Sequence, residues 1–84
     1  MKLVLIDPSQ VQHHPVSWQK AYRYAKAMDN GAKFPPVKAH KRDGRWIVQD
    51  GAHRTMAAKL TGQRLLVRTK SIFTETEGQL VREI

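Results

Sequence analysis

Apolar residues recur with helical spacing in two segments of the chain. Over residues 17–30 they repeat at i, i+3, i+4, i+7 and i+10, forming one stripe of Trp18, Ala21, Tyr22, Ala25 and Met28. Ser17 is a suitable N-cap and Asn30-Gly31 a suitable left-handed stop, so this segment is predicted to be a helix. A second, shorter helix is predicted over 52–61, with Gly62 as its stop and one shared face formed by His53, Met56, Ala57 and Leu60.

Shorter apolar runs, bounded by turn residues, predict strands. Leu3–Ile6 is a compact run that Asp7-Pro8 ends, and residues 65–73 form the last such segment. Residues 37–41 and 45–49 flank Arg42-Asp43-Gly44, in which Asp-Gly is a strong hairpin signal. The second arm of this hairpin is apolar at each of positions 46–48, which favours a central strand. The order strand–helix–hairpin–helix–strand predicts a mixed α/β (α+β) layer structure.

Length limits the chain to one small domain. The chain has 84 residues, fewer than the roughly 100–150 of a usual domain. Residues 1–73 are predicted to form this domain. Residues 74–84 carry three Glu and one Arg, and they are interpreted as an acidic tail or as a short edge strand at Gln79–Arg82.

Charge and composition narrow the classes of function. The net charge is +8 and the sequence contains no cysteine, which excludes disulfides, thiolate metal sites and a cysteine nucleophile. No apolar run approaches the roughly 20 residues that span a bilayer, and the apolar run near the N-terminus is too short for a signal peptide. We therefore expect a cytoplasmic protein that does not enter membranes. We also expect its excess of positively charged residues to bind a polyanion.

The segment with the clearest chemistry is the predicted junction of strand and helix at residues 48–55. The first turn of a helix presents unpaired N–H groups and a partial positive charge, which together favour anions. Gly51 would let a phosphate approach the backbone, and His53 and Arg54 add donors in the same turn. Asp50 would either cap the helix or share a divalent cation with the phosphates. The ordinary alternative is a strand–glycine–helix turn that binds nothing.

Residues 50–62, Asp-Gly-Ala-His-Arg-Thr-Met-Ala-Ala-Lys-Leu-Thr-Gly, resemble a signature of the ParB N-terminal/sulfiredoxin superfamily. Residues 5–8 resemble the family's opening strand, and residues 34–37 resemble the proline segment before its hairpin. The resemblance covers about residues 3–70. It implies the ParB/sulfiredoxin-like fold and a nucleoside triphosphate, CTP or ATP with or without Mg²⁺, bound at its phosphates by Gly51, Ala52, His53, Arg54 and Thr55.

Departures from the family restrict this expectation. Sulfiredoxins have their catalytic cysteine where this chain has Ala52, so sulfinic acid reduction is excluded. The related free-serine kinases use a carboxylate in the loop before the first helix, whereas residues 11–15 contain no acid, which disfavours a kinase. The helix-turn-helix and dimerisation domain that follow in partition ParB proteins do not fit after residue 73.

Basic residues suggest a second contact, with DNA. They cluster on the predicted hairpin and on the first helix, and a contiguous arrangement would form a surface for a nucleic-acid backbone, composed of Lys20, Arg23, Lys26, Lys38, Lys41, Arg42 and Arg45. The alternative is a solvated face. Tyr24 lies off the apolar stripe, where it would stack on a base or lie on the surface. His13-His14 and His40 are not expected to bind a metal, because adjacent residues of a strand point to opposite faces.

Three functions remain open at this stage. The first is a ParB-like nucleotide-binding module associated with DNA in a plasmid, phage or partition context. The second is a small Mg²⁺-dependent phosphohydrolase or nuclease, with Asp50 as metal ligand and His53 as general acid or base. The third is a phage or plasmid adaptor that acts on a host protein. Association into a homodimer is open in each case.

Overall fold

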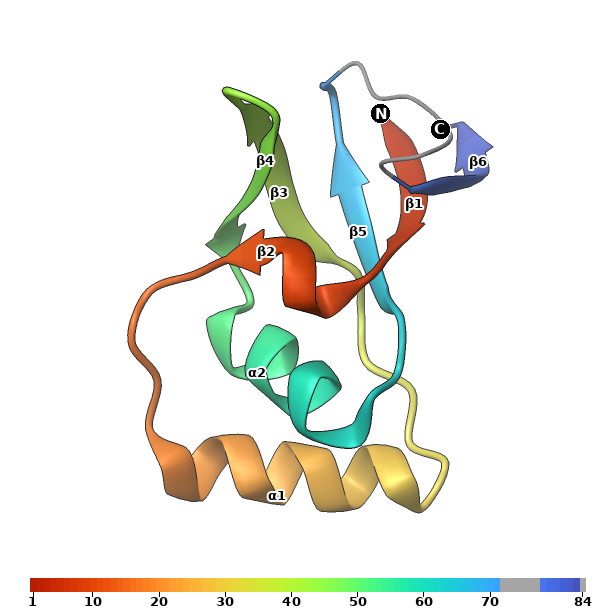
Figure 1. Ribbon diagram of the computed structural model, residues 1–84. Coiled ribbons are helices and arrows are strands. Elements are labelled where there is room, and N and C mark those ends of the chain that lie inside the picture. The colour runs from red at the N-terminus through yellow and green to blue at the C-terminus, as the bar shows by residue number, and fades with distance from the viewer. Residues whose placement is uncertain (72–77, 84) are drawn as a thin grey trace.

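The computed structural model describes residues 1–71 and 78–83. Within them the chain forms two α-helices, a short 3-10 turn and six strands, in the order β1 (Lys2–Ile6), η1 (Pro8–Gln10), β2 (Val11–Gln12), α1 (Trp18–Asp29), β3 (Val37–Arg42), β4 (Arg45–Asp50), α2 (Ala52–Thr61), β5 (Leu65–Thr69) and β6 (Gln79–Glu83). In Figure 1 the sheet occupies the upper part of the molecule, α2 lies beneath it, and α1 forms the lowest layer. The mixed α/β architecture predicted from the sequence is confirmed.

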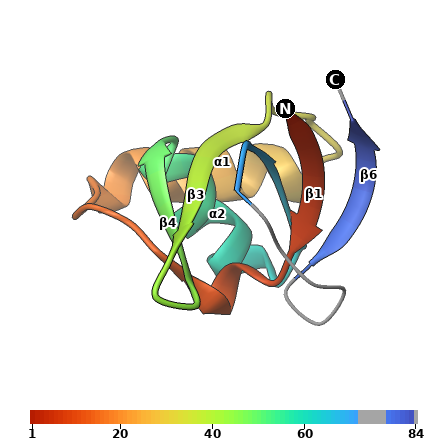
Figure 2. The ribbon, with the colours of Figure 1, turned by 90° about the horizontal axis from the view of Figure 1, so that it is seen from above.

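The six strands form one mixed sheet in the order β2-β4-β3-β5-β1-β6. Strand β1 is antiparallel to both of its neighbours, whereas β3 is parallel to β5 and β2 is parallel to β4. Figure 2 shows that the sheet is curved, with β4 and β3 on one side and β1 and β6 on the other. Residues 45–50 form an interior strand as expected, since β4 lies between β3 and the two-residue β2.

The predicted hairpin is present, and its turn has the expected chemistry. Asp43 and Gly44 both adopt positive φ, 52° and 78°, as the central residues of a type I′ turn require. The turn joins β3 to β4 with Arg42 opposite Arg45.

The core lies against one face of the curved sheet, here called the inner face. Strand residues with alternate spacing point into it, and α2 contributes Ala58, so that the buried cluster comprises Val4, Ile6, Val11, Val37, Ala39, Trp46, Val48, Ala58, Leu65 and Val67. Trp46 is its largest fully buried side chain. The opposite face of the sheet is called the outer face.

Helix α1 packs on α2, in a layer further from the sheet. Its caps are those predicted, because the Ser17 hydroxyl accepts from the Lys20 amide at 3.5 Å and Asn30 ends the helix. Only the small members of the apolar stripe, Ala21 and Ala25, are buried, whereas Trp18 is 53% and Tyr22 58% exposed. A helix that covers only another helix buries a narrow strip, so the large aromatic residues of the stripe lie at its border.

Helix α2 also differs from its predicted face. Its buried residues are Thr55, Ala57 and Ala58, and Leu60 is 40% exposed. The reason is that α2 lies between two layers, so it buries one side against the sheet and another against α1. A single stripe with a 3.6-residue period does not describe such a helix.

The two C-terminal strands, β5 and β6, lie within or close to the segments predicted for them. Strand β5 ends at Thr69, and Phe73 lies outside the described residues. Strand β6 lies at an edge of the sheet and pairs with β1. In the part of the chain that the structure describes, no helix has the length and apolar character needed to cross a membrane.

Candidate functional site

The turn from β4 into α2 has a backbone geometry that requires glycine. Gly51 is the N-cap of α2, with φ 113° and ψ 30°. A Cβ atom at this position would lie 2.5 Å from Cγ1 of Val37, 2.8 Å from its Cβ and 3.0 Å from Nη2 of Arg54. Since Val37 is fully buried, the space beside Gly51 is filled by the core. The glycine is therefore explained by packing, whether or not a phosphate approaches it.

The first turn of α2 has free backbone donors. No side chain caps the helix, and within the described residues the first amide of this turn with an acceptor is that of Thr55, which donates to the Gly51 carbonyl at 2.9 Å. The amides of residues 52–54 have none, as is usual for an uncapped helix start. The expectation that Asp50 caps this helix is wrong, because Asp50 is the last residue of β4 and its side chain is 74% exposed.

A cavity of about 300 Å³ lies in front of this turn. Its wall is formed by the end of β4, the start of α2, one side of α1 and the segment before α1. Its charged and aromatic lining consists of His14, Lys20, Tyr24, Asp50, His53 and Arg54. Five of the residues predicted for the nucleotide site thus meet at one cavity, namely Asp50, Gly51, Ala52, His53 and Arg54. The cavity is within the 300–1,000 Å³ range of small-molecule sites.

His53 connects the two helices. Its Nε2 accepts a hydrogen bond from the Ser17 amide at 3.0 Å, so in the neutral ring the proton is on Nδ1. Its ring also lies edge-on to Tyr24, with 6.3 Å between centroids. This engagement of Nε2 leaves Nδ1 as the donor that a ligand can reach.

The guanidinium of Arg54 both bonds to the protein backbone and lines the cavity. Nη1 donates to the carbonyl groups of Pro35 and Pro36 at 2.9 and 3.2 Å, and Nη2 lies 3.8 Å from Oδ2 of Asp50. The side chain is only 18% exposed. Arg54 therefore anchors the segment before β3, and its remaining N–H groups, rather than the whole fork, face the cavity.

Thr55 lies on the other side of the helix from the cavity. It is fully buried, and both its amide and its hydroxyl donate to the Gly51 carbonyl, at 2.9 and 3.0 Å. Thr55 thus has no donor left for a phosphate, and its predicted role in binding does not fit this arrangement.

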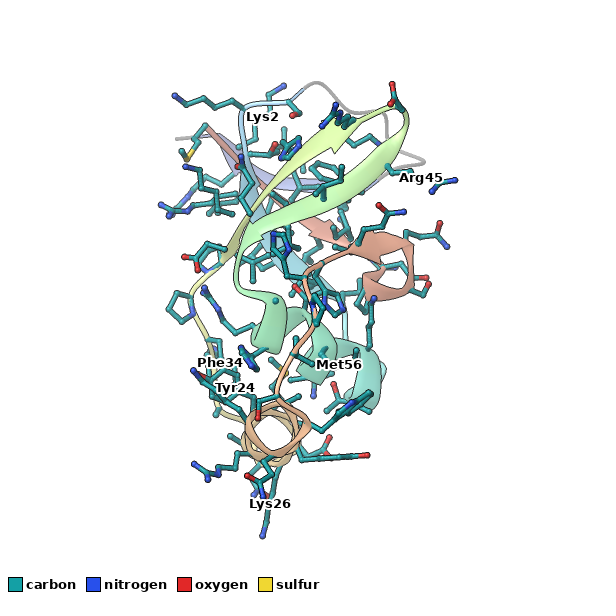
Figure 3. All side chains as sticks on the ribbon, turned by 90° about the vertical axis from the view of Figure 1, so that its left-hand side faces the viewer. Lys2, Tyr24, Lys26, Phe34, Arg45 and Met56 are labelled. Atoms are coloured by element: carbon teal, nitrogen blue, oxygen red, sulfur yellow. The ribbon has the colours of Figure 1, made fainter. Side chains whose placement is uncertain are left out.

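Aromatic packing at the cavity was not foreseen in the sequence. Tyr24 stacks on Phe34, with 5.1 Å between ring centroids and 28° between planes, and Figure 3 shows the two side by side next to α1. Nζ of Lys20 lies 5.7 Å from the Tyr24 centroid. The Phe-Pro-Pro sequence at 34–36 was the available signal, because it holds Phe34 in an extended segment beside the helix.

Acidic residues are few at this site. The described residues contain no group of three or more metal-ligating side chains. Asp7 lies away from this site at η1, where its Oδ1 accepts from the Ser9 amide at 2.9 Å and the Ser9 hydroxyl at 2.8 Å. The bond from the Ser9 amide is the main cause that lowers the pKa of Asp7.

Asp7 lines a different and larger cavity of about 560 Å³. This cavity lies between the tip of the β3–β4 hairpin, the end of β1 and the start of β6, and the cations on its wall are Lys41, Arg45 and Arg64. Two of these are already engaged, since Lys41 Nζ donates to the Gly44 carbonyl at 3.2 Å and Arg64 Nη1 donates to Gln79 at 3.3 Å.

The basic residues predicted to form one DNA surface do not lie together. Lys41, Arg42 and Arg45 are near the tip of the hairpin, whereas Lys20, Arg23 and Lys26 belong to α1. Figure 3 shows Arg45 and Lys26 at opposite ends of the molecule, whose longest extent is 33 Å. The condition that the two groups be contiguous is therefore not met, because α2 and the sheet separate them (Figure 1 and Figure 3).

Comparison with known proteins identifies the fold. No protein-family model matches the chain, and no curated protein matches it significantly in sequence. Among solved structures, sulfiredoxin from Arabidopsis thaliana matches with a TM-score of 0.69 and 15% identity, over 90% of this chain and 92% of that chain. The C-terminally truncated chromosome-partitioning protein ParB from Caulobacter crescentus, complexed with CTP-gamma-S, matches with a TM-score of 0.71 and 10% identity.

The match to ParB covers 89% of this chain and 47% of the other. A conserved hypothetical protein from Pyrococcus furiosus also matches, with a TM-score of 0.70 and 19% identity, over 89% of this chain and 34% of that one. This chain thus spans about half of the ParB chain and about a third of the Pyrococcus one. At these identities the comparisons establish architecture, and the protein has the ParB/sulfiredoxin-like fold predicted from its sequence.

Proposed function

We propose that the protein is a cytoplasmic nucleotide-binding module that takes a nucleoside triphosphate, CTP or ATP, at the start of α2 and associates with DNA. The observation that carries the proposal is the set of unpaired amides at residues 52–54, which open into a cavity also lined by Lys20 and Arg54. Oriented amides and a helix N-terminus favour phosphate oxygens. The CTP analogue in the Caulobacter ParB structure supports this choice of ligand.

Each group has a distinct part in this proposal. The amides of residues 52–54 bind phosphate oxygens, and the remaining N–H groups of Arg54 and the ammonium of Lys20 neutralise charge. Nδ1 of His53 donates one further hydrogen bond. Gly51 serves the packing of the turn, and Thr55 takes no part. A base extending from the phosphates would lie near the Tyr24–Phe34 pair, whose stacking already fixes the Tyr24 ring.

In this proposal Asp50 determines how nucleotide binding depends on Mg²⁺. Its carboxylate lies beside the proposed phosphate position and 3.8 Å from Nη2 of Arg54. Without a cation it repels phosphates, because like charges at close range are unfavourable. We propose that Asp50 contributes one oxygen ligand to Mg²⁺, which mostly retains water and phosphate ligands in nucleotide sites.

Titration of the 15N-labelled protein with CTP, ATP and GTP, with and without Mg²⁺, tests the proposal. We expect saturable shifts at the amides of residues 51–54 and a preference for one triphosphate. Lys20→Gln should weaken binding, whereas Lys26→Gln, which removes the same charge from a position outside the cavity lining, should not. Amides that stay unmoved at millimolar nucleotide would refute nucleotide binding.

Asp50→Asn separates the two roles of the carboxylate. If Asp50 holds Mg²⁺, the variant loses the gain in affinity that Mg²⁺ gives to the wild type. If the carboxylate only repels phosphates, the variant binds more tightly to the same extent with and without Mg²⁺, and the proposed metal ligand is refuted.

The enzyme hypothesis receives less support from the geometry. Catalysis by metal and general acid–base chemistry requires Asp50 to hold the cation and His53 to transfer a proton. Asp50 is the one carboxylate in the cavity lining, as far as the described residues show, and Nε2 of His53 is bonded to the backbone of Ser17. We therefore propose binding rather than turnover as the function of this site.

A further inference from the structure

The outer face of the sheet carries cations that the predicted DNA surface mostly left out. Along β3 the residues alternate, with Val37 and Ala39 buried against the core and Lys38 exposed between them. Along β5 the alternation is the same, with Val67 and Thr69 buried and Arg68 exposed. Alternate residues of a strand point to opposite faces, so Lys38 and Arg68 lie on the outer face.

The strand register aligns these cations across the sheet. Lys38 of β3 is paired with Arg68 of β5, Arg68 is paired with Leu3 of β1, and Leu3 is paired with Arg82 of β6. These strands run side by side in this order (Figure 1). Three steps between neighbouring strands place the outermost cations about 14 Å apart. Lys38, Arg68 and Arg82 thus form one line across four strands, here called the outer-face cations.

The side chains of the outer-face cations have no charged partner in the described part of the chain. Among the side chains of residues 1–71 and 78–82, none of these three takes part in a hydrogen bond or ion pair. Asp50 lies opposite Lys38 in the β3–β4 register, but its closest cation is Nη2 of Arg54, at 3.8 Å. Lys70, two residues after Arg68, is exposed as well and extends the positive charge along the sheet.

We infer that the outer-face cations bind the phosphate backbone of duplex DNA. A line of about 14 Å is comparable to the roughly 12 Å width of the B-DNA major groove, so cations at its two ends can reach phosphates of both strands. Among the described residues the alternation along the strands places the His40 ring on this face but no Phe, Tyr or Trp side chain, so the face lacks a row of aromatic rings for stacking unpaired bases. Binding is therefore directed at phosphates and is independent of sequence.

Duplex DNA fits this face better than a lipid surface does. Membrane-surface binding needs apolar side chains that insert between the headgroups, but Leu3, the residue between Arg68 and Arg82 in the register, is only 8% exposed. The inference rests on the association with DNA proposed above and not on the nucleotide site, which lies at the start of α2.

Salt dependence of binding to a fluorescent duplex of random sequence tests the inference. The variant K38Q/R68Q/R82Q removes three charges and keeps polar side chains of similar length over Leu3. The control R23Q/K26Q/K33Q removes the same charge from three positions away from the outer face. Each phosphate contact contributes about 0.9 to the slope of log K against log salt, so the outer-face variant should lower the magnitude of the slope by about 2.7.

The outcomes are separable. A lower slope in the outer-face variant alone, with an unchanged circular dichroism spectrum and melting temperature, supports the inference. Equal losses in both variants indicate net charge rather than a surface, and this result overturns it. Binding of the wild type to vesicles rich in acidic lipid but not to duplex DNA, or equal binding by all three proteins, also overturns it. The amide titration with nucleotides decides the nucleotide proposal independently.

Discussion

Substitution of the glycine at the start of α2 is the most direct test of the packing described here. Gly51→Ala has two costs. A non-glycine residue at φ 113° is strained by about 1–3 kcal/mol. The new methyl group would also lie 2.5 Å from Cγ1 of Val37, and overpacking of a filled core adds about 1–3 kcal/mol. We expect a total loss of about 2–6 kcal/mol in the free energy of unfolding.

Gly62→Ala is the matched control on the same helix. Gly62 also has positive φ, 70°, but nothing lies within 4 Å of the position that its new methyl group would take. Only the backbone cost of about 1–2 kcal/mol applies there. The difference between the two variants therefore contains the contact with Val37 together with the larger backbone cost at φ 113°. The Val37→Ala background isolates the contact, and in it the cost of Gly51→Ala should fall by about 1 kcal/mol or more.

Urea unfolding monitored by tryptophan fluorescence measures these differences. A chain of this size has a stability of about 4–13 kcal/mol, so Gly51→Ala is expected to shift the midpoint strongly and in a poorly stable background to leave the protein partly unfolded. If Gly51→Ala costs no more than Gly62→Ala, the turn does not pack as described. The explanation of Gly51 by packing would then be refuted, and a requirement for ligand approach would take its place.

Three further predictions concern groups near the two cavities. Arg54→Lys should destabilise the fold by about 1–3 kcal/mol, because one ammonium cannot replace a guanidinium bonded to two carbonyl groups of the segment before β3. Urea unfolding of this variant and of the wild type measures the loss of stability, and an unchanged midpoint would contradict the prediction. His53→Ala should accelerate hydrogen exchange at the Ser17 amide, which loses its acceptor, and unchanged exchange would contradict this bond. Asp7 should titrate below an ordinary Asp in a carboxyl 13C experiment, and Ser9→Ala should raise its pKa towards the ordinary value. Because the pKa is lowered on folding, the stability contributed by Asp7 is present above its unfolded pKa and is lost as pH falls through its folded pKa.

The elements were predictable where local signals agreed with each other. Ser17 and Asn30-Gly31 delimit α1 within one residue of its observed ends, and Asp43-Gly44 forms the hairpin turn. These signals act through neighbouring backbone groups, so a sequence reveals them without knowledge of the tertiary structure.

Burial on the helices was less predictable because it depends on the layers. The stripe on α1 includes Trp18 and Tyr22, yet both are more than half exposed. No local pattern indicates that α1 covers a helix instead of the sheet. The same limit applies to β2, whose two residues are too short for a period-2 pattern.

The candidate site was predictable in position but only partly in chemistry. The glycine between a strand and a helix located the turn, and the resemblance at residues 50–62 indicated the fold that contains it. Sequence alone could not show that Arg54 holds the carbonyl groups before β3, or that His53 accepts from Ser17. Both bonds join segments at least 18 residues apart, and such contacts exist only once the layers are assembled.

These contacts also bear on how the turn can bind a ligand. Because Nη1 of Arg54 and Nε2 of His53 are already bonded within the protein, the positions of both side chains are fixed before any phosphate arrives. A donor that is held in place loses little conformational entropy on binding, which favours affinity. The same bonds reduce the number of free N–H groups, so the backbone amides of residues 52–54 must supply most of the contacts. Affinity at this site should therefore depend on the geometry of the turn more than on the charge of any single side chain.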